Sequence, residues 1–358
     1  MSERVLMKGN EAFAAAAIKS GCRFYFGYPI TPQNELTEYM SRELPKAGGS
    51  FIQAESELAA VNMAYGAAVA GGSVMITSSS PGIALMQEGI SFACSAEVPI
   101  VFMNVSRGGP GIGGIQPGQA DYFQVTRGGG NGDYHVPVFS PATIQESADI
   151  IAKAFEIADH YRNPVMILAD GMMGQMMEPV ALPEEKQPVD PEKVEEVKPW
   201  ALCGHKDKRE HNVIQSLYLV PDELENHNID LHKKALDMKE KLVQWKSTGL
   251  EDAEVVFVAF GTMSRIVTEA IEVLGKEGIK AGLIRPITLW PFPFKAFEEI
   301  GQKTKVVISA ELNMGQMIED VDRAIKGKYP VELIQRSGGM VPTPLEVVAK
   351  TKEILGVK

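Results

Sequence analysis

The chain has 358 residues, a length typical of two ordinary domains rather than one. Apolar residues make up 45% of the sequence and charged residues 23%, a balance that excludes a long disordered chain. The formal net charge of −11 offers no basic field for nucleic acid or an anionic membrane, which favours a small molecule or another protein as the partner.

Up to about residue 180 the sequence alternates amphipathic segments with short apolar runs. Helices are predicted, in chain order, at residues 12–19, 33–43, 58–70, 83–93 and 143–161. Strands are predicted at residues 23–27, 73–77, 99–105 and 165–169. Alternation of this kind predicts an open, doubly wound parallel sheet with helices on both faces.

The second half of the chain opens with a change of composition. Residues 182–199 are rich in Pro, Glu, Lys and Val without periodicity and are typical of a linker, and residues 224–246 resume as a charged surface or subunit-contact helix. A second α/β unit then follows, with strands at 255–260, 281–284 and 305–310 and helices at 264–277, 294–300, 315–325 and 344–355. We expect a domain at 1–181, a linker and helix at 182–250 and a second domain at 251–358.

The three cysteines, Cys22, Cys94 and Cys203, are too few and too far apart for a disulfide framework, a four-cysteine zinc site or an iron–sulfur cluster. A reducing compartment is the simpler interpretation. The first ten residues lack the apolar core of a signal peptide, and no stretch approaches the roughly 18 apolar residues of a membrane span. We therefore expect a cytoplasmic protein with no membrane partner.

Glycines gather after the strand predicted at 99–105. The run Gly109-Pro110-Gly111-Ile112-Gly113-Gly114 formally resembles a dinucleotide fingerprint, but that motif needs a helix to open at its glycines. Here the chain continues as Ile115-Gln116-Pro117-Gly118, a turn sequence, so we predict no nicotinamide or flavin site. The glycines fit equally a close backbone approach to a ligand or subunit, or a mobile surface loop.

Several polar residues are candidates for a binding site. Thr31, in Gly27-Tyr28-Pro29-Ile30-Thr31-Pro32, fits an N-cap or an anion ligand at the carboxyl end of a strand. Glu55 and Glu57, in Gln53-Ala54-Glu55-Ser56-Glu57-Leu58, fit first-turn carboxylates facing the helix dipole, or a desolvated acid or base at the head of an Ala-rich helix, and spacing does not decide between these interpretations. Arg107 fits a bidentate carboxylate partner or an exposed strand end.

The histidines show no metal-ligand spacing such as H-E-x-x-H, so no metal site is predicted. On the residues alone, the chain is an α/β protein with an anion site, and its reaction stays open. Six segments taken together carry more information than any one of them. They are residues 27–32, the Glu57-led helix through Tyr65-Gly66, and residues 106–110, 132–134, 285–293 and 311–316.

In combination, these segments resemble the 2-oxoacid:ferredoxin oxidoreductases, in particular the alpha-type subunit of the enzymes that oxidise 3-methyl-2-oxobutanoate. The resemblance implies a thiamine-diphosphate pyrimidine-binding-type doubly wound sheet and a transketolase-C-terminal-like α/β domain. It also implies coenzyme-A-dependent oxidative decarboxylation of branched-chain 2-oxo acids, with electrons passing to ferredoxin. Glu57 would then hydrogen-bond N1′ of thiamine, and Thr31 and Arg107 would hold the substrate carboxylate.

The same resemblance implies that this chain is not the whole enzyme. A partner subunit with a G-D-G motif and a downstream Asn would hold the diphosphate and magnesium, whereas the nearest string here is Ala169-Asp170-Gly171 without that Asn. Gamma-type and ferredoxin-like subunits are the other expected partners. Because this chain lacks cysteine motifs, the iron–sulfur clusters are expected on partner subunits only.

Two alternatives stay open within this resemblance. The substrate could be 2-oxoglutarate or pyruvate, and Arg127 is the one obvious second cation for a distal carboxylate. The chain could instead be a non-catalytic assembly subunit with the same fold, although Thr31, Glu57 and Arg107 are all present.

Overall fold

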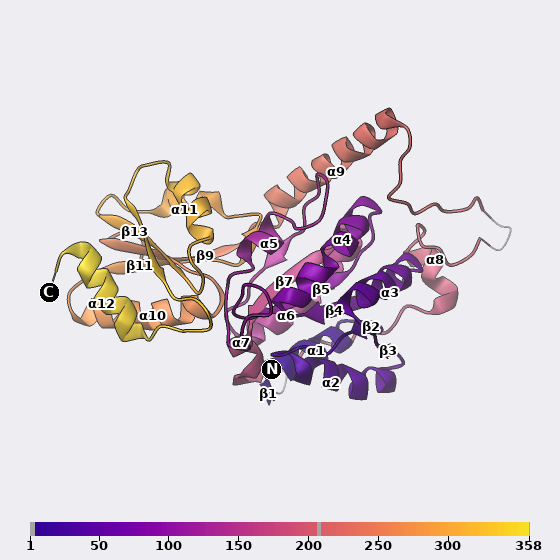
Figure 1. The fold of residues 1–358 in the computed structure, drawn as a ribbon, viewed down its shortest axis with the longest axis horizontal. Coiled ribbons are helices and arrows are strands. Elements are labelled where there is room, and N and C mark those ends of the chain that lie inside the picture. Colours follow the sequence, from indigo (N-terminus) through magenta and orange to yellow (C-terminus); the bar gives the residue numbers. More distant parts are fainter. Residues whose placement is uncertain (1–3, 206–208, 358) are drawn as a thin grey trace.

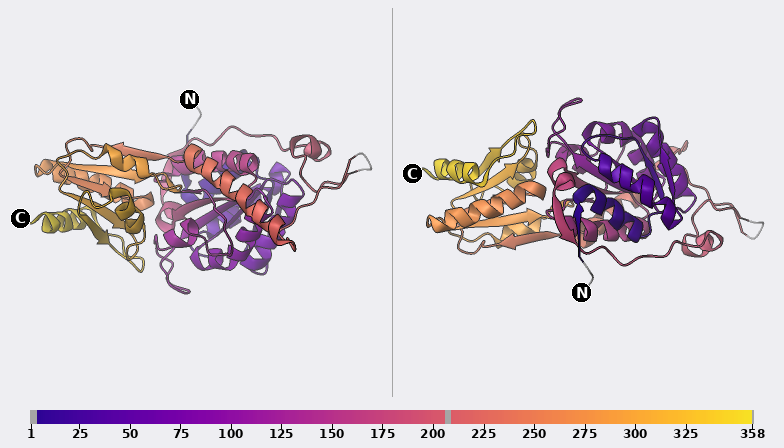
Figure 2. Two further views of the ribbon diagram at one scale, coloured as in Figure 1. Left: turned by 90° about the horizontal axis from the view of Figure 1, so that it is seen from above. Right: turned by 90° about the horizontal axis from the view of Figure 1, so that it is seen from below.

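The computed structural model describes residues 4–205 and 209–357, which form two α/β units, each built on its own sheet (Figure 1). Both units lie side by side, the N-terminal one at one end of the molecule and the C-terminal one at the other (Figure 2). Among the described residues, no helix is both long and apolar enough to cross a membrane. The observed architecture confirms the predicted α/β class.

The N-terminal sheet has seven strands in the order β12-β6-β7-β5-β4-β2-β3, all parallel to their neighbours except β12, which is antiparallel to β6. In chain order the strands are β2 (Phe24–Gly27), β3 (Ser50–Gln53), β4 (Val74–Ser78), β5 (Val101–Ser106), β6 (Val138–Phe139), β7 (Val165–Asp170) and β12 (Thr288–Trp290). The central strands β4, β5 and β7 are buried throughout, as expected where helices cover both faces.

Each face of this sheet has its own hydrophobic core, because successive side chains of a strand point to opposite faces. Within β4, Met75 packs in one core and Val74 and Ile76 pack in the other. The first core is covered by α1 (Gly9–Lys19), α2 (Asn34–Glu43) and α6 (Ile144–Tyr161). The second is covered by α3 (Glu57–Val69) and α4 (Ser80–Ser95). The doubly wound arrangement is therefore the one that the sequence predicts.

Shorter elements complete the N-terminal unit. The strands β1 (Val5–Lys8) and β8 (Met177–Val180) form a separate antiparallel pair. The remaining elements up to residue 200 are η1 (Pro45–Ala47), α5 (Tyr122–Thr126), α7 (Gly171–Gln175), η2 (Pro191–Lys193) and α8 (Val194–Val197). The last two lie in the segment predicted as a linker, whose stretch before η2 runs along the outside of the unit (Figure 2).

The C-terminal sheet has five strands in the order β14-β13-β10-β11-β9, parallel except for β9. The strands are β9 (Trp245–Thr248), β10 (Val255–Val258), β11 (Ala281–Pro286), β13 (Val306–Glu311) and β14 (Val331–Gln335). One face packs on α10 (Gly261–Lys276) and α12 (Pro344–Leu355), and α11 (Met317–Ile325) covers the other. A 3-10 helix, η3 (Phe294–Glu299), precedes β13.

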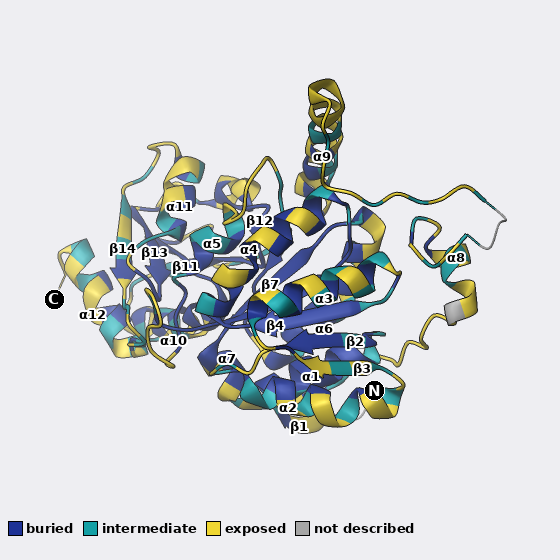
Figure 3. Cartoon of the chain, turned by 45° about the vertical axis from the view of Figure 1, so that its right-hand side comes forward, coloured by how far each residue is buried: buried dark blue, intermediate teal, exposed yellow. Residues whose placement is uncertain are grey.

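The helix α9 (Pro221–Lys241) joins the two units and differs from its prediction at the end. The sequence predicts a helix as far as residue 246. In the structure, Trp245 and Lys246 belong to β9 and pair with Pro286 and Arg285 of β11, so sheet pairing replaces the last helical turn. Leu231 and Met238 are buried, whereas Leu236 is half exposed. Figure 3 shows the far end of α9 largely exposed.

Two strands cross the expected domain limits. β9 precedes residue 250 yet belongs to the C-terminal sheet, and β12 follows residue 251 yet pairs with β6 of the N-terminal sheet. The helix predicted at 294–300 is a 3-10 helix, η3. The division at residues 181 and 250 stays a prediction.

Candidate active site

The three predicted site residues follow different strands of one parallel sheet. Thr31 lies in the turn after β2, Glu57 begins α3 after β3, and Arg107 directly follows β5. Since β2, β3, β4 and β5 run parallel, their carboxyl ends share one edge of the sheet, where ligands bind in folds of this class.

The structure brings Arg107 into contact with Thr31, 76 positions away in the chain. The Arg107 Nη1 donates to the Thr31 carbonyl oxygen at 2.8 Å and to its Oγ1 at 3.2 Å, and Nη2 donates to the Ile112 carbonyl oxygen at 2.9 Å. Arg107 is only 6% exposed, and its Nε has no hydrogen-bond partner within the described residues. A buried, oriented guanidinium with unused donor capacity is suited to a carboxylate.

The N-cap interpretation of Thr31 is wrong. The helix α2 begins at Asn34, Gln33 holds the cap position, and Thr31 is exposed in the preceding turn. Gln33 is instead buried, and its Oε1 accepts from the Thr77 hydroxyl at 2.6 Å. Thr31 therefore has no capping role, while its role as an anion ligand stays a prediction.

Glu57 is buried, with 5% of its surface exposed, although it is the first residue of its helix. The cap is Ser56, whose Oγ accepts from the Ala59 N–H at 3.2 Å. The contact of the Glu57 carboxyl with the Ser78 hydroxyl, at 3.5 Å, is at the limit of a hydrogen bond. Glu55 is exposed, so the two glutamates differ as the acid–base hypothesis requires.

Space beside the Glu57 carboxyl depends on a glycine. A Cβ built at Gly82 would lie 2.0 Å from the Ser78 Oγ and 2.4 Å from the Glu57 Oε1, distances that no real side chain tolerates. The absence of a side chain in this first turn of α4 therefore keeps the Glu57 carboxyl where it is. A buried carboxyl with most of its hydrogen-bonding capacity unused fits a ring nitrogen of a bound ligand.

Sequence reasoning missed the serines that link Glu57 to Arg107. In the run Ser78-Ser79-Ser80, Ser78 contacts Glu57, and the Ser80 Oγ accepts from the Arg107 N–H at 3.0 Å. Sequence reasoning also missed Asp121, whose Oδ2 accepts from the Ser80 hydroxyl at 2.5 Å. The run of three serines between a strand and a helix was the available signal. Asp121 gave none, since it looks like a cap for the short α5.

The glycine-rich loop folds back on itself. The Gly108 N–H donates to the Gln116 carbonyl oxygen and the Gly114 N–H donates to the Gly108 carbonyl oxygen, both at 2.8 Å. Gly113 has φ +57°, and a Cβ there would lie 1.8 Å from the Gly108 oxygen. No helix opens at these glycines among the described residues, and the next one, α5, begins at Tyr122. The glycine run therefore forms a turn, in contrast to the helix start that a dinucleotide fingerprint needs.

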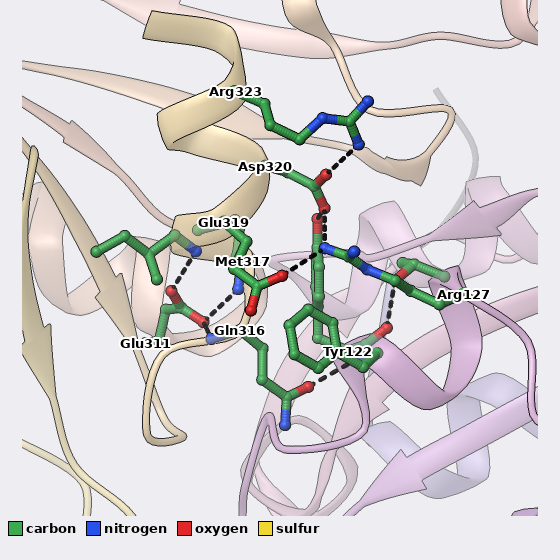
Figure 4. Close-up of polar contacts among 11 residues, drawn as sticks. Tyr122, Arg127, Glu311, Gln316, Met317, Glu319, Asp320 and Arg323 are labelled. Atoms are coloured by element: carbon green, nitrogen blue, oxygen red, sulfur yellow. Dashed lines mark hydrogen bonds and ion pairs between the residues drawn. The ribbon is translucent and has the colours of Figure 1, made fainter. Parts of the chain in front are cut away.

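Arg127 forms ion pairs with residues of the C-terminal unit. Its Nη2 lies 3.2 Å from the Glu319 Oε2 and 3.5 Å from the Asp320 Oδ2, and Asp320 also accepts from the Tyr122 hydroxyl at 2.8 Å (Figure 4). Its guanidinium also lies over the Phe123 ring, 4.5 Å from the centroid. Arg127 is therefore a cation of the junction between the two units.

Asp170, in the string nearest to a G-D-G motif, is a helix cap. Its Oδ1 accepts from the N–H groups of Met172 and Met173, each at 3.0 Å, and burial raises the pKa of its carboxyl above the ordinary value. In the part of the chain that the structure describes, no cluster of three or more His, Cys, Asp or Glu side chains could hold a metal ion.

Comparison with known families assigns both halves of the chain. Residues 15–246 match the family described as pyruvate flavodoxin/ferredoxin oxidoreductase, thiamine diphosphate-binding, and residues 253–347 match pyruvate:ferredoxin oxidoreductase core domain II. The chain belongs to the 2-oxoacid:ferredoxin oxidoreductase family. The predicted resemblance is confirmed, and the N-terminal unit carries that family's thiamine diphosphate-binding domain.

Relatives of the alpha type match this oxidoreductase chain along almost its full length. It is 45% identical to the ketoisovalerate oxidoreductase subunit VorB of Methanothermobacter thermautotrophicus, covering 98% of both chains. It is 38% identical to the 2-oxoglutarate synthase subunit KorA of Methanocaldococcus jannaschii, covering 95% of this chain and 97% of that one. Both relatives are named as subunits, so the chain is one subunit of a larger oxidoreductase.

Solved structures agree on the fold. The 2-oxoglutarate:ferredoxin oxidoreductase of Magnetococcus marinus superposes with a TM-score of 0.83 at 27% identity over 98% of this chain, which spans 65% of that chain's length. A split-gene transketolase superposes with a TM-score of 0.58 at 17% identity, over 98% of this chain and 99% of that one. The transketolase likeness supports the predicted fold class alone.

The candidate site of this oxidoreductase chain lies apart from three cavities of the described structure. Cavities of about 800, 560 and 370 Å³ lie elsewhere, the largest between α9, β12 and α11, and none of the three is lined by Thr31, Glu57 or Arg107. The observations at Glu57 and Gly82 fit the aminopyrimidine part of thiamine diphosphate, whereas the described chain offers no cluster for the magnesium.

Proposed function

We propose that this chain is the alpha-type subunit of an enzyme that oxidatively decarboxylates branched-chain 2-oxo acids, 3-methyl-2-oxobutanoate first. The acyl group would pass to coenzyme A and the electrons to ferredoxin. One observation carries the proposal: two buried charged side chains lie at the same sheet edge. The Glu57 carboxyl has unused hydrogen-bonding capacity, and the Arg107 Nε has no hydrogen-bond partner within the described residues.

Glu57 would hold the aminopyrimidine ring at N1′, where a shared proton favours the imino form of the ring. Its burial excludes water from that hydrogen bond, which strengthens it. Thiamine diphosphate, when bound, supplies the electron sink for decarboxylation. The task of this chain is therefore to place a proton at one ring nitrogen and to orient the substrate.

Arg107 and Thr31 would orient the substrate carboxylate. The Arg107 fork points at Thr31 and at the loop carrying Ile112, and its buried Nε has no hydrogen-bond partner within the described residues. The carboxylate charge disappears as carbon dioxide leaves, so very tight binding of that charge would stabilise the ground state and slow the reaction. Both residues are therefore expected to bind the carboxylate with moderate affinity and to orient the acid, rather than to bind it very tightly.

A partner subunit would complete the site. Large apolar side chains are exposed on this side of the N-terminal unit, with Leu58 on α3 46% exposed and Leu85 on α4 55% exposed. Exposed apolar residues on neighbouring helices are typical of a protein interface. We assign the diphosphate and magnesium to a G-D-G-containing partner, and the iron–sulfur clusters to gamma-type and ferredoxin-like subunits.

The environment of Arg127 favours a branched-chain acid over 2-oxoglutarate. A second carboxylate would need a second cation, and Arg127 already pairs with Glu319 and Asp320. Similarity points the same way, since the identity to the VorB relative exceeds that to the KorA relative.

The test is kcat/KM for a panel of 2-oxo acids on the complete complex. Branched acids should differ from one another by small steps, about fourfold for each methylene, because a buried methylene contributes about 0.8 kcal/mol. Discrimination against 2-oxoglutarate should be steeper, because its distal carboxylate would be desolvated without a partner. A 2-oxoglutarate rate equal to that of the branched acids would contradict the assignment of substrate.

A further inference from the structure

Asp121 is a buried carboxylate that the proposed reaction does not use. It is 8% exposed, and its Oδ2 accepts three hydrogen bonds, from the Ser80 hydroxyl at 2.5 Å, the Ser106 hydroxyl at 2.7 Å and the Asn104 Nδ2 at 2.9 Å. The donors come from the end of β5 and the start of α4. The Asp121 Oδ2 therefore links β5 to α4, two of the elements that form the candidate site.

Ser80 connects this carboxylate to Arg107. A hydroxyl has one proton to donate, and two acceptors compete for it, the Asp121 Oδ2 at 2.5 Å and the Arg107 carbonyl oxygen at 3.3 Å. The closer, charged acceptor takes the proton, since charge-assisted hydrogen bonds are the stronger ones. The lone pairs of the Ser80 oxygen are then left to accept the Arg107 N–H at 3.0 Å.

Asp121 is itself held from the other unit. Two positions earlier, Gln119 donates its N–H to the Leu312 carbonyl oxygen at 2.9 Å and accepts the Leu312 N–H on its side chain at 3.1 Å. The Asn313 Nδ2 donates to the Gln119 carbonyl oxygen at 3.0 Å. The segment carrying Asp121 is thus fixed to the loop after β13.

We infer that Asp121 is a positioning residue for Arg107, acting through the Ser80 hydroxyl. It fixes the direction of the Ser80 proton, and Ser80 then fixes the backbone from which the Arg107 guanidinium reaches Thr31. The inference rests on the proposed role of Arg107 at the substrate carboxylate. It adds Ser80 and Asp121 to the residues that set the affinity for the acid.

The test compares Ser80→Ala with Ser106→Ala in the complete complex. Each variant deletes one hydroxyl that donates to Asp121, but only Ser80 also accepts the Arg107 N–H. Two quantities are measured, KM against kcat for 3-methyl-2-oxobutanoate and the inhibition constant of its neutral amide. Ser80→Ala should raise KM about tenfold, with kcat within about threefold and the amide constant unchanged, because the lost contact orients a group that binds the carboxylate.

Ser106→Ala should change KM less than about twofold, and Asp121→Asn should shift KM in the direction of Ser80→Ala, since an uncharged acceptor holds the serine proton more weakly. The inference would be overturned if Ser80→Ala and Ser106→Ala changed KM equally. It would also be overturned if Ser80→Ala lost equal affinity for the acid and for its neutral amide. Asp121→Asn decides the matter if Ser80→Ala fails to assemble.

A further variant, Arg107→Met, separates this inference from the proposed function. If Arg107→Met leaves the affinity for the acid unchanged, the proposed role of Arg107 is wrong, and the inference falls with it. If Arg107→Met loses that affinity and Ser80→Ala does not, only the role of Ser80 and Asp121 is wrong.

Discussion

The two sheets each place a buried glutamate beside the first turn of a helix, and the two glutamates differ in what they bind. Glu57 of the N-terminal unit is 5% exposed and makes one long contact, with Ser78 at 3.5 Å. Glu311 of the C-terminal unit is fully buried and accepts four hydrogen bonds. Its donors are the Ser309 hydroxyl at 2.8 Å and the N–H groups of Gln316 at 3.0 Å, Met317 at 2.8 Å and Ile318 at 2.8 Å.

This difference separates a structural carboxylate from a candidate catalytic one. Burying a charge without partners is costly, so a buried carboxyl is normally satisfied by its own chain, as Glu311 is by the start of α11. Glu57 departs from that rule within the described residues, and this departure supports its proposed contact with a ligand. Burial alone does not identify the site, whereas unused hydrogen-bonding capacity does.

The largest effect is expected for Glu57→Gln. The amide keeps the shape of the side chain but cannot share an acidic proton, so turnover of the complete complex should fall by about 10²- to 10⁴-fold. Assembly and thermal stability should stay unchanged, because the carboxyl contributes little to the fold. Steady-state kinetics with Glu55→Gln as the control provides the test, and near-normal turnover would leave Glu57 as a helix-dipole carboxylate and favour the assembly-subunit alternative.

Glu311→Gln should show the opposite pattern. The amide can accept some of the four hydrogen bonds, but its NH₂ group would face at least one donor and leave it buried and unpaired. We expect the free energy of unfolding to fall by about 2 to 3 kcal/mol. Urea unfolding measures this loss, and turnover per folded complex should stay within about threefold of wild type. A loss of turnover without a loss of stability would remove the contrast with Glu57.

A partly buried carboxylate, Glu146 on α6, lies between these extremes. Its oxygens accept from both terminal nitrogens of Arg285 on β11, at 2.7 and 2.8 Å, so the pair joins the two units. Burial alone would raise the pKa of Glu146, but the Arg285 guanidinium, the Ala142 N–H and Lys246 together outweigh it and hold the pKa below the ordinary 4.5. The pair therefore stabilises the fold fully above about pH 4.5, and this contribution is lost as pH falls through the lowered pKa.

Glu146→Gln should remove that acid sensitivity. The variant should be less stable than wild type by about 1 to 2 kcal/mol at neutral pH, and the difference should shrink as pH falls below 4.5. Urea unfolding at a series of pH values measures both effects. A constant difference between the two proteins at every pH would show that the shifted carboxyl is not Glu146.

The smallest effect is expected for Arg127→Ala. The ion pairs of Arg127 with Glu319 and Asp320 are partly exposed, and such pairs contribute less than about 1 kcal/mol. The ratio of kcat/KM for branched acids to that for 2-oxoglutarate should not change, because Arg127 is held at the junction. A marked change in this ratio would return Arg127 to the substrate site.

Strong local signals made most of the fold predictable. The helix predicted at 344–355 has the bounds of α12, and the structure shows why it begins there, with a capping box of Thr343 and Glu346 and with Pro344 in the first turn. The strands β3 and β14 were missed, since short edge strands with exposed residues carry no continuous apolar run. The end of α9 was misplaced because Trp245 looks like the next apolar position of the helix, and its pairing with Pro286 depends on tertiary structure.

The candidate site was less predictable from the residues alone. Thr31 and Arg107 touch across 76 positions, and no local pattern predicts a contact at that range. Only the family resemblance joined them before the structure did. Asp121 could not be found either, because its proposed role depends on its contact with Ser80, 41 positions away, which only the fold brings together.

The pairing of β12 with β6 has a consequence for the order in which the chain is made. Strands β2 to β7 have all been synthesised once translation reaches Asp170. The sheet edge formed by β6 (Val138–Phe139) stays uncovered until β12 (Thr288–Trp290) leaves the ribosome. At translation rates of about 5 to 20 residues per second, that interval lasts on the order of 10 s. An open sheet edge can pair with other chains, so nascent or truncated proteins that end before Thr288 should aggregate more readily than the full chain.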